Sequence, residues 1–311
     1  MAVADSHILT VDVEDWFHLL ELGCGPDREQ WSRLESRVVA NTERLLALFE
    51  ANGARATFFV VGWVAERQPD LVRRIAAAGH ELGSHSYWHE VVSCYDRPSL
   101  AADLERSRKV LEDATGRPVS AFRAPGFSIT EETAWAFDLV AEAGFRIDAS
   151  LWRGRASHGG FATPYDGPHR LLTRAGELIE IPASTRVGSL PFPYGGGGYL
   201  RLLPAPALHA AIAANARRGV PTTLYVHPRD FDPRQPRIPM PAVRRFKSYV
   251  GLAGAEAKLR RLLRAFRWTS ASAWLEAHPH ALDGRLLDVR AVAASAQPRP
   301  DPARVPPLPA A

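Results

Sequence analysis

The chain alternates short apolar stretches, rich in β-branched and aromatic residues, with longer stretches whose apolar residues recur at helical spacing. Short apolar runs bounded by turn residues predict buried strands. Seven segments fit this description: 8–13, 56–61, 80–83, 121–123, 145–148, 178–181 and 222–226. Helical spacing predicts helices over 38–50, 69–78, 99–115, 130–143, 206–218 and 256–267, and several of these stretches end at glycine.

This order of strand and helix implies a parallel sheet. About seven strands in one continuous series favour an α/β barrel over a doubly wound sheet. Segments 152–173 and 188–198 are rich in glycine and proline, so we expect loops there. We expect one catalytic domain over residues 1–290, including a C-terminal helical extension. The Pro/Ala-rich residues 291–311 are expected to form a disordered tail.

Composition narrows the class of protein. The 311 residues are 46% hydrophobic, which is enough for a full core, and the net charge of +4 does not argue for nucleic acid. The two cysteines, Cys24 and Cys94, form no paired motif, so we expect a reducing compartment and no disulfide framework. The first residues lack the pattern of a signal peptide, and no apolar run is long enough to span a membrane. We therefore expect a cytoplasmic enzyme.

Three acids, Asp12, Glu14 and Asp15, stand within four positions where the first predicted strand ends. Like charges this close raise one another's pKa unless a cation neutralises them. A solvated turn or a helix cap would also use such residues. In a parallel barrel, however, the carboxyl ends of the strands form the active-site face.

Two histidines, His85 and His89, follow the third predicted strand. One helical turn would point both imidazoles the same way. Two histidines with one carboxylate form a common open site for zinc or a similar ion.

Three further groups stand after later strands. Arg123 could pair with a buried carboxylate and hold it ionised, or lie on the surface beside a proline turn. Asp148 could orient a histidine or cap the following turn. His227 ends the last predicted strand and is well placed as a general acid.

Taken together and in this order, the motifs resemble those of the polysaccharide deacetylases, the family-4 carbohydrate esterases with a NodB homology domain. The five motifs lie at 10–15, 85–89, 123–125, 148–150 and 224–228, and the resemblance covers roughly residues 5 to 270. The extended first motif, with 191–204 and 245–249, is similar to the subgroup found in exopolysaccharide loci with exosortase systems. The resemblance implies a distorted (β/α) barrel of about seven parallel strands.

It also implies roles for the site residues. A divalent metal, expected to be Zn²⁺, is held by His85, His89 and a carboxylate that is either Glu14 or Asp15. Asp12 takes a proton from water while Arg123 holds it in place, and His227, oriented by Asp148, protonates the leaving amine. Contacts with substrate are expected from three residues, Leu224, Pro125 and Tyr194.

The implied reaction removes N-acetyl groups from amino sugars of a polysaccharide or of its precursor, which could be lipid-linked, in exopolysaccharide biosynthesis. The chain departs from the subgroup at Arg229-Asp230, where a Trp-Glu pair is common, and we expect this to alter substrate contacts more than chemistry.

Other functions fit the same residues. One is a C–N hydrolase of a small cyclic amide, which the intact histidine pair disfavours. Another is a catalytically inactive carbohydrate-binding or scaffold protein, which the retention of Asp12 and His227 disfavours. The helix expected over 256–267 has leucines on one side and cations on the other, so it packs on the barrel or turns its basic face to an anionic membrane. The oligomeric state stays open.

Overall fold

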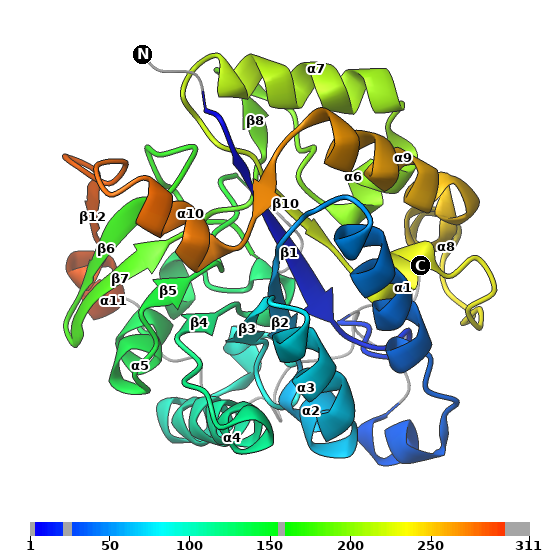
Figure 1. Ribbon diagram of the computed structural model, residues 1–311. Coiled ribbons are helices and arrows are strands. Elements are labelled where there is room, and N and C mark those ends of the chain that lie inside the picture. The colour runs from blue at the N-terminus through cyan, green and yellow to red at the C-terminus, as the bar shows by residue number, and fades with distance from the viewer. Residues whose placement is uncertain (1–3, 21–26, 155–158, 296–311) are drawn as a thin grey trace.

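One sheet runs through the middle of the molecule in the computed structural model, which describes residues 4–20, 27–154 and 159–295 (Figure 1). Its order is β10-β1-β2-β3-β4-β5-β7-β6-β12, with β11 paired to the first residues of β1. All neighbouring strands are parallel except β6 and β7. The strands are β1 His7–Val13, β2 Thr57–Val60, β3 Glu81–Ser84, β4 Ala121–Phe122, β5 Ile147–Asp148, β6 His169–Thr173, β7 Gly176–Glu180, β10 Thr223–Val226, β11 Trp268–Thr269 and β12 Leu286–Asp288, with a separate pair of β8 Arg186–Val187 and β9 Leu190–Pro191.

The segment that follows β7 spans the gap between β7 and β10. The Ser184 amide donates to the Thr223 carbonyl at 3.4 Å, and the Thr223 amide donates to Ser184 Oγ at 2.9 Å. Further along, the Tyr225 amide donates to the Gly195 carbonyl at 2.7 Å. The predicted distorted barrel is confirmed, and its seven predicted parallel strands are β1, β2, β3, β4, β5, β7 and β10.

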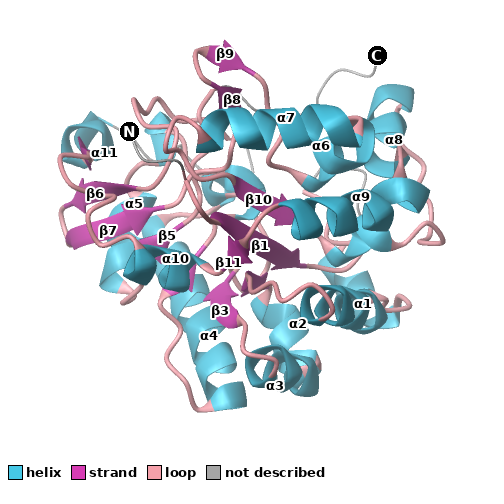
Figure 2. Cartoon of the chain, turned by 45° about the horizontal axis from the view of Figure 1, so that its top comes forward, coloured by secondary structure: helices cyan, strands magenta, loops and turns pink. Residues whose placement is uncertain are grey.

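Helices surround the strands, as Figure 2 shows. They are α1 Val38–Glu50, α2 Gly62–Arg67, α3 Pro69–Ala77, α4 Arg97–Thr115, α5 Ala136–Glu142, α6 Gly197–Leu202, α7 Ala205–Ala216, α8 Ala242–Tyr249, α9 Leu252–Ala265, α10 Ala271–Ala277 and α11 Arg290–Ser295. The predicted helices are confirmed to within a few residues, with one exception. The stretch 130–143 is divided into a 3₁₀ turn, Glu131–Thr133, and α5.

Two helices illustrate why these residues adopt these structures. Helix α4 starts where the Asp96 carboxylate accepts the Ser99 amide at 2.9 Å, and it ends at Gly116, whose φ of 66° suits a residue without a Cβ. Helix α9 buries four leucines, Leu252, Leu259, Leu262 and Leu263, against the rest of the molecule. The leucine face of this helix therefore packs on the barrel, as one of our two interpretations of residues 256–267 predicted.

Both predicted loops contain regular structure that we did not predict. Residues 169–173 form β6, antiparallel to β7, with side chains that alternate between buried and half-buried. In the segment 188–198, β9 occupies residues 190 and 191, and α6 begins at Gly197. We predicted loops from the glycine and proline content. The strands are too short, and the helix starts inside a glycine run, so neither gives a clear local pattern. Residues 155–158 lie outside the described part of the chain.

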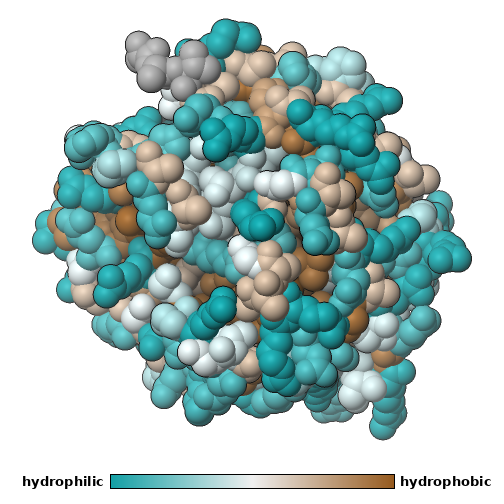
Figure 3. All heavy atoms as spheres, in the orientation of Figure 1, coloured by the Kyte–Doolittle hydropathy of each residue, from teal (hydrophilic) through white to brown (hydrophobic). Residues whose placement is uncertain are grey.

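The domain boundary expected at residue 290 falls inside structure. Helix α11 continues to Ser295 and buries Ala293, so the first five residues of the expected tail belong to the fold. Residues 296–311 lie outside the described residues. Hydrophilic residues cover most of the face in Figure 3, and apolar residues emerge there in small patches. Within the described ranges, no helix is both long enough and apolar enough to cross a membrane.

Candidate active site

The carboxylate of Asp12 lies at the centre of the site. Thr10 and Asp12 are two positions apart on β1, so their side chains point to the same face. The guanidinium of Arg123, which follows β4, donates to Asp12 Oδ1 at 2.6 Å and to Thr10 Oγ1 at 2.9 Å, and it also donates to the Ala149 carbonyl at 3.0 Å. Arg123 and Asp12 are both buried, and the three hydrogen bonds of the guanidinium fix the geometry of their ion pair.

Beside Asp12, three side chains bring possible metal-ligand atoms together. One atom each from Glu14, His85 and His89 lies within 4.8 Å of the other two, and all three residues are buried. His89 Nε2 is 2.6 Å from Glu14 Oε2, and His85 Nε2 is 4.0 Å from Asp12 Oδ2. Burial by itself would raise the pKa of Glu14, but the charges of His89, His227 and Arg229 lower it to about 2.

The donor set suits a divalent ion. His85 Nδ1 donates a hydrogen bond to the Arg123 carbonyl at 2.7 Å. The lone pair of His85 Nε2 is therefore free to bind a metal ion beside Glu14 and His89. Two imidazoles and one carboxylate are the ligands of an open catalytic metal site. The residues present therefore fit the metal.

The two histidines do not share a helical turn, contrary to our prediction. Residues 85–90 form an irregular loop, in which Ser86 and His89 have positive φ of 63° and 53°. The buried carboxylate of Asp103 on α4 holds this loop by accepting the amides of Tyr87 at 2.8 Å and Trp88 at 3.1 Å. Sequence reasoning missed Asp103, because nothing local marks an acid within a helix as an anchor for a distant loop.

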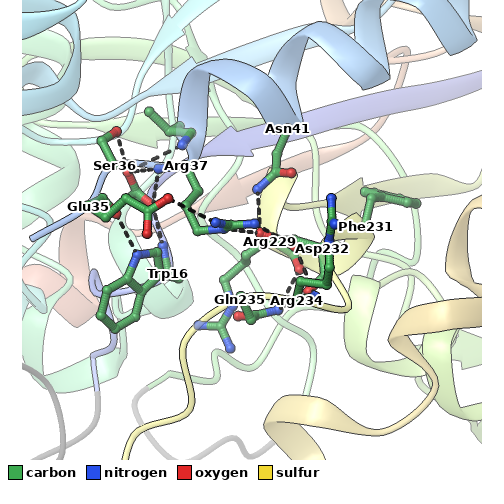
Figure 4. Close-up of polar contacts among 12 residues, drawn as sticks. Trp16, Glu35, Ser36, Arg37, Asn41, Arg229, Phe231, Asp232, Arg234 and Gln235 are labelled. Atoms are coloured by element: carbon green, nitrogen blue, oxygen red, sulfur yellow. Dashed lines mark hydrogen bonds and ion pairs between the residues drawn. The ribbon is translucent and has the colours of Figure 1, made fainter.

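Asp15 is turned away from the metal-ligand cluster, so it is excluded as the alternative ligand. Its carboxylate accepts Ser36 Oγ at 2.6 Å and the Arg37 amide at 3.0 Å, just before α1, and the Trp16 amide at 2.9 Å. Figure 4 shows Trp16, Ser36 and Arg37 gathered at this point. Burial raises the pKa of Asp15, although these hydrogen bonds oppose the rise.

His227 faces the cluster from the end of β10. Its Nε2 lies 3.9 Å from Asp12 Oδ2 and 3.8 Å from Glu14 Oε1. Its Nδ1 is 2.9 Å from Asp230 Oδ2, and Arg201 Nε is 2.8 Å from Asp230 Oδ1. Burial would lower the pKa of His227, but these carboxylates, with Asp230 contributing most, raise it to about 9.

The residue that orients His227 is therefore Asp230, and the prediction that Asp148 does so is wrong. Asp148 instead accepts Ser150 Oγ at 2.7 Å, and Ser150 Oγ accepts the Ala124 amide at 2.8 Å, so it positions the chain next to Arg123. Burial and the neighbouring charge of Asp148 raise the pKa of Glu180 well above its usual range. The spacing of His227 and Asp230, three residues apart in a turn, is a local signal that could have identified Asp230.

The turn carrying His227 and Asp230 is tied to α1. Asp232 Oδ2 accepts Arg37 Nε at 2.5 Å and Asn41 Nδ2 at 3.2 Å, and Figure 4 shows these side chains converging. Gly197, at the start of α6, lies so close to Asp230 that an added Cβ would overlap the carboxylate. The glycine run therefore allows α6 to approach the turn.

A cleft of about 730 Å³ opens over these groups, and its aromatic wall consists of Phe127, Trp152, Tyr199 and Tyr225. The three predicted substrate contacts, Leu224, Pro125 and Tyr194, are buried and do not line this cleft. Leu224 precedes Tyr225 on β10 and points to the opposite side of the strand. Pro125 lies two residues before Phe127 in the same 3₁₀ turn. The Tyr194 hydroxyl is 2.9 Å from Thr222 Oγ1, away from the cleft.

His18 also lines the cleft, and sequence reasoning did not assign it a role. Its Nδ1 accepts the Asp15 amide at 2.8 Å, so its ring proton resides on Nε2. This Nε2 is buried and has no hydrogen-bond partner among the described residues.

Two family models match the chain. Residues 28–147 match "Polysaccharide deacetylase", and residues 149–276 match "Domain of unknown function (DUF3473)". A peptidoglycan-N-acetylglucosamine deacetylase of Bacillus cereus is 32% identical over 111 residues, which cover 36% of this chain and 50% of the relative. A peptidoglycan deacetylase of Helicobacter pylori is 32% identical over 167 residues, which cover 48% of this chain and 54% of the relative. The chain thus spans about half the length of these curated relatives.

Solved structures share the fold. A candidate polysaccharide deacetylase from Mycobacterium smegmatis superposes with a TM-score of 0.61 at 22% identity, covering 92% of this chain and 94% of that one. The Puue allantoinase superposes with a TM-score of 0.56 at 18% identity, covering 89% and 90%. The comparisons therefore show that residues 28–147 are similar to the polysaccharide deacetylases, that residues 149–276 match a domain of unknown function, and that the chain shares the fold of the solved polysaccharide deacetylase.

Proposed function

We propose that this protein hydrolyses N-acetyl groups from amino sugars of a polysaccharide or its precursor, and that it depends on a divalent metal, Zn²⁺. The observation that carries the proposal is the convergence of Glu14, His85 and His89 beside Asp12 and His227 in one cleft. That arrangement supplies a metal site, a base and an acid within reach of one amide bond.

Each group has one task in the proposed reaction. A divalent ion on Glu14, His85 and His89 would supply Lewis acidity toward the acetamide carbonyl and toward water. Asp12 accepts the proton of the attacking water, and the hydrogen bond from Arg123 at 2.6 Å fixes the direction of its carboxylate. His227 donates a proton to the departing amine, which would otherwise leave poorly. Asp230 holds the ring of His227 with Nε2 toward the cleft.

The substrate class follows from the family and the relatives. The two relatives described above are named for peptidoglycan, an N-acetylated glycan. We propose an exopolysaccharide or its lipid-linked precursor as the substrate of this chain and the cytoplasm as its location. The expected reducing compartment and the similarity to the exopolysaccharide subgroup support this proposal.

We also propose peripheral contact with an anionic membrane through the outward face of α9. Arg260, Arg261 and Arg264 are exposed there, whereas the leucines of α9 face inward. Cations at a membrane surface are each worth about 1 kcal/mol of attraction to anionic lipid. Sedimentation with anionic vesicles at low salt, compared with neutral vesicles, tests this contact, and equal binding to both would contradict it.

Acetate release from N-acetylglucosamine oligomers and from peptidoglycan fragments tests the function directly. We expect activity that a chelator removes and Zn²⁺ restores. Asp12→Asn should abolish turnover and keep about one metal ion per chain, whereas Glu14→Gln should lose the metal as well. Asp15→Asn is the matched control: it should keep the metal, because Asp15 contacts the start of α1 instead.

Two outcomes would replace the proposal. Hydrolysis of a cyclic amide such as allantoin, without acetate release from any glycan, would favour the small-amide hydrolase. Glycan binding without turnover in metal-loaded protein would favour an inactive carbohydrate-binding protein.

A further inference from the structure

Two cations of the cleft form no ion pair with any residue that the structure describes. Arg229 follows the His227-Pro228 pair, and Lys247 lies on α8; both line the cleft. Within the described residues, neither the Arg229 guanidinium nor the Lys247 ammonium forms a hydrogen bond or an ion pair. An arginine that lies in a cleft without a carboxylate partner is available to a ligand.

The other cations that line or adjoin the cleft are already paired. Arg123 is bound to Asp12 at 2.6 Å, and Arg201 is bound to Asp230 at 2.8 Å. The Arg201 guanidinium also donates to the Lys247 carbonyl at 3.1 Å, which ties the backbone of α8 to the cleft wall. Among the described residues, Arg229 and Lys247 are therefore the cleft cations without an ion pair, and the charge of Arg229 acts on nearby Glu14 without a direct contact.

The same cleft offers a surface for a sugar ring. Trp152 and Tyr199 are stacked, with ring centroids 6.4 Å apart and planes at 27°, and both line the cleft. Aromatic faces of this kind accept the apolar C–H face of a pyranose, while charged groups fix its orientation. The cleft thus combines an aromatic surface for a sugar ring with two cations that form no ion pair within the described residues.

We propose that the cleft binds an anionic N-acetylated glycan, with Arg229 and Lys247 contacting a carboxylate or phosphate close to the amino sugar that is deacetylated. This inference rests on the proposed function and specifies its substrate. Arg229 presents a planar fork that matches either anion bidentately, and Lys247 adds a flexible point charge.

The test compares three substrates at matched metal content: a neutral N-acetylglucosamine tetramer, an oligomer alternating N-acetylglucosamine with glucuronate, and a nucleoside-diphosphate N-acetylglucosamine. We expect kcat/KM for at least one anionic substrate to exceed that for the neutral one by about tenfold, the size of one charge-assisted contact. Raising NaCl from about 0.05 M to about 0.5 M should reduce this ratio, because salt screens exposed charges. Preference for glucuronate identifies a carboxylate ligand, and preference for the diphosphate identifies a phosphate ligand.

Variants separate this subsite from general charge effects. The ratio of anionic to neutral kcat/KM should fall to about one in Arg229→Gln/Lys247→Gln. Arg245→Gln, which removes an exposed charge of the same helix outside the cleft lining, should leave the ratio unchanged. An equal effect of Arg245→Gln, or no preference for either anionic substrate, overturns the proposal.

Calorimetry with the same oligomers keeps the two proposals distinct. If no substrate releases acetate, the proposed function fails, yet binding of the anionic oligomers to the wild-type chain still reports on the subsite. Tighter binding of an anionic oligomer that disappears in Arg229→Gln/Lys247→Gln supports the subsite. Equal binding of neutral and anionic oligomers refutes it.

Discussion

The behaviour of His227 depends on what its two ring nitrogens face. Nδ1 is held by Asp230 at 2.9 Å, and Nε2 points to the carboxylates of Asp12 and Glu14. A proton on Nε2 is thereby stabilised and directed at the place where an amine would leave. In the proposed reaction, Asp230 orients the ring and His227 donates the proton, so substitutions of the two residues should have different effects.

Replacing His227 by Ala should lower kcat far more than it raises KM, by roughly 10²–10⁴-fold, since the proton is needed only as the amine departs. The loss should be much smaller for an activated acetate ester, whose leaving group needs no protonation. Steady-state kinetics on both substrates, with the folded variant, provide the measurement. Equal losses on amide and ester would mean that His227 only supports the end of β10.

Replacing Asp230 by Asn should shift the pH profile of kcat. Burial lowers the pKa of His227, and the negative charge of Asp230 is the largest of the influences that outweigh it and raise the pKa to about 9. Removing this charge lowers the pKa, so the acid loses its proton at lower pH and the alkaline limb of the profile moves down. An unchanged limb with uniformly lower kcat would show that Asp230 acts on position alone.

At the scale of elements, the loop after β3 depends on α4. Asp103 holds the amides of Tyr87 and Trp88, and so sets the path between His85 and His89. The positive φ of His89 is a conformation that an unsupported loop would leave.

Asp103→Asn should therefore weaken metal binding by about 10- to 100-fold, the usual cost of losing support behind a ligand. Competition with a chelator measures the affinity. Asp113→Asn on the same helix is the control, because Asp113 is exposed and pairs only with Lys109 within the described residues. A similar loss in both variants would assign the effect to the stability of α4 and not to the loop.

At the scale of the whole molecule, two buried histidines far from the cleft link stability to pH. His7 Nδ1 accepts the Thr222 amide at 3.1 Å, and His80 Nδ1 accepts the Ala56 amide at 3.2 Å, so both rings are neutral in the fold. Burial lowers the pKa of each from 6.5 to about 4. Below pH 6.5 these two histidines bind protons in the unfolded chain but stay neutral in the folded chain.

The stabilising effect of these two rings is thus complete above pH 6.5 and is lost as pH falls toward 4. Urea unfolding at about pH 7.5 and about pH 4.5 should show a decrease of a few kcal/mol, to which carboxylates also contribute. His80→Gln should reduce the decrease, whereas His280→Gln, at an exposed site, should not. An identical decrease in wild type and His80→Gln would contradict this linkage.

The sequence by itself determined the course of the barrel and most members of the site. All seven predicted parallel strands are present, and most of them stand out in the sequence because buried parallel strands tend to be short apolar runs. Asp12, His85, His89, Arg123 and His227 converge because the carboxyl ends of neighbouring parallel strands meet at one edge. The short strand β6 and the start of α6 escaped prediction, since pairing with β7 and packing against the turn after β10 stabilise them.

Only the tertiary structure decided which of the two adjacent acids, Glu14 or Asp15, joins the two histidines. Glu14 and Asp15 are adjacent, and their directions are set by partners elsewhere in the chain, since Ser36 and Arg37 draw Asp15 away. Asp230 orients His227 because Arg201 on α6 fixes its carboxylate, a contact that no local pattern contains. A side chain's direction beyond the end of a strand depends on hydrogen-bond partners that the fold alone brings within reach.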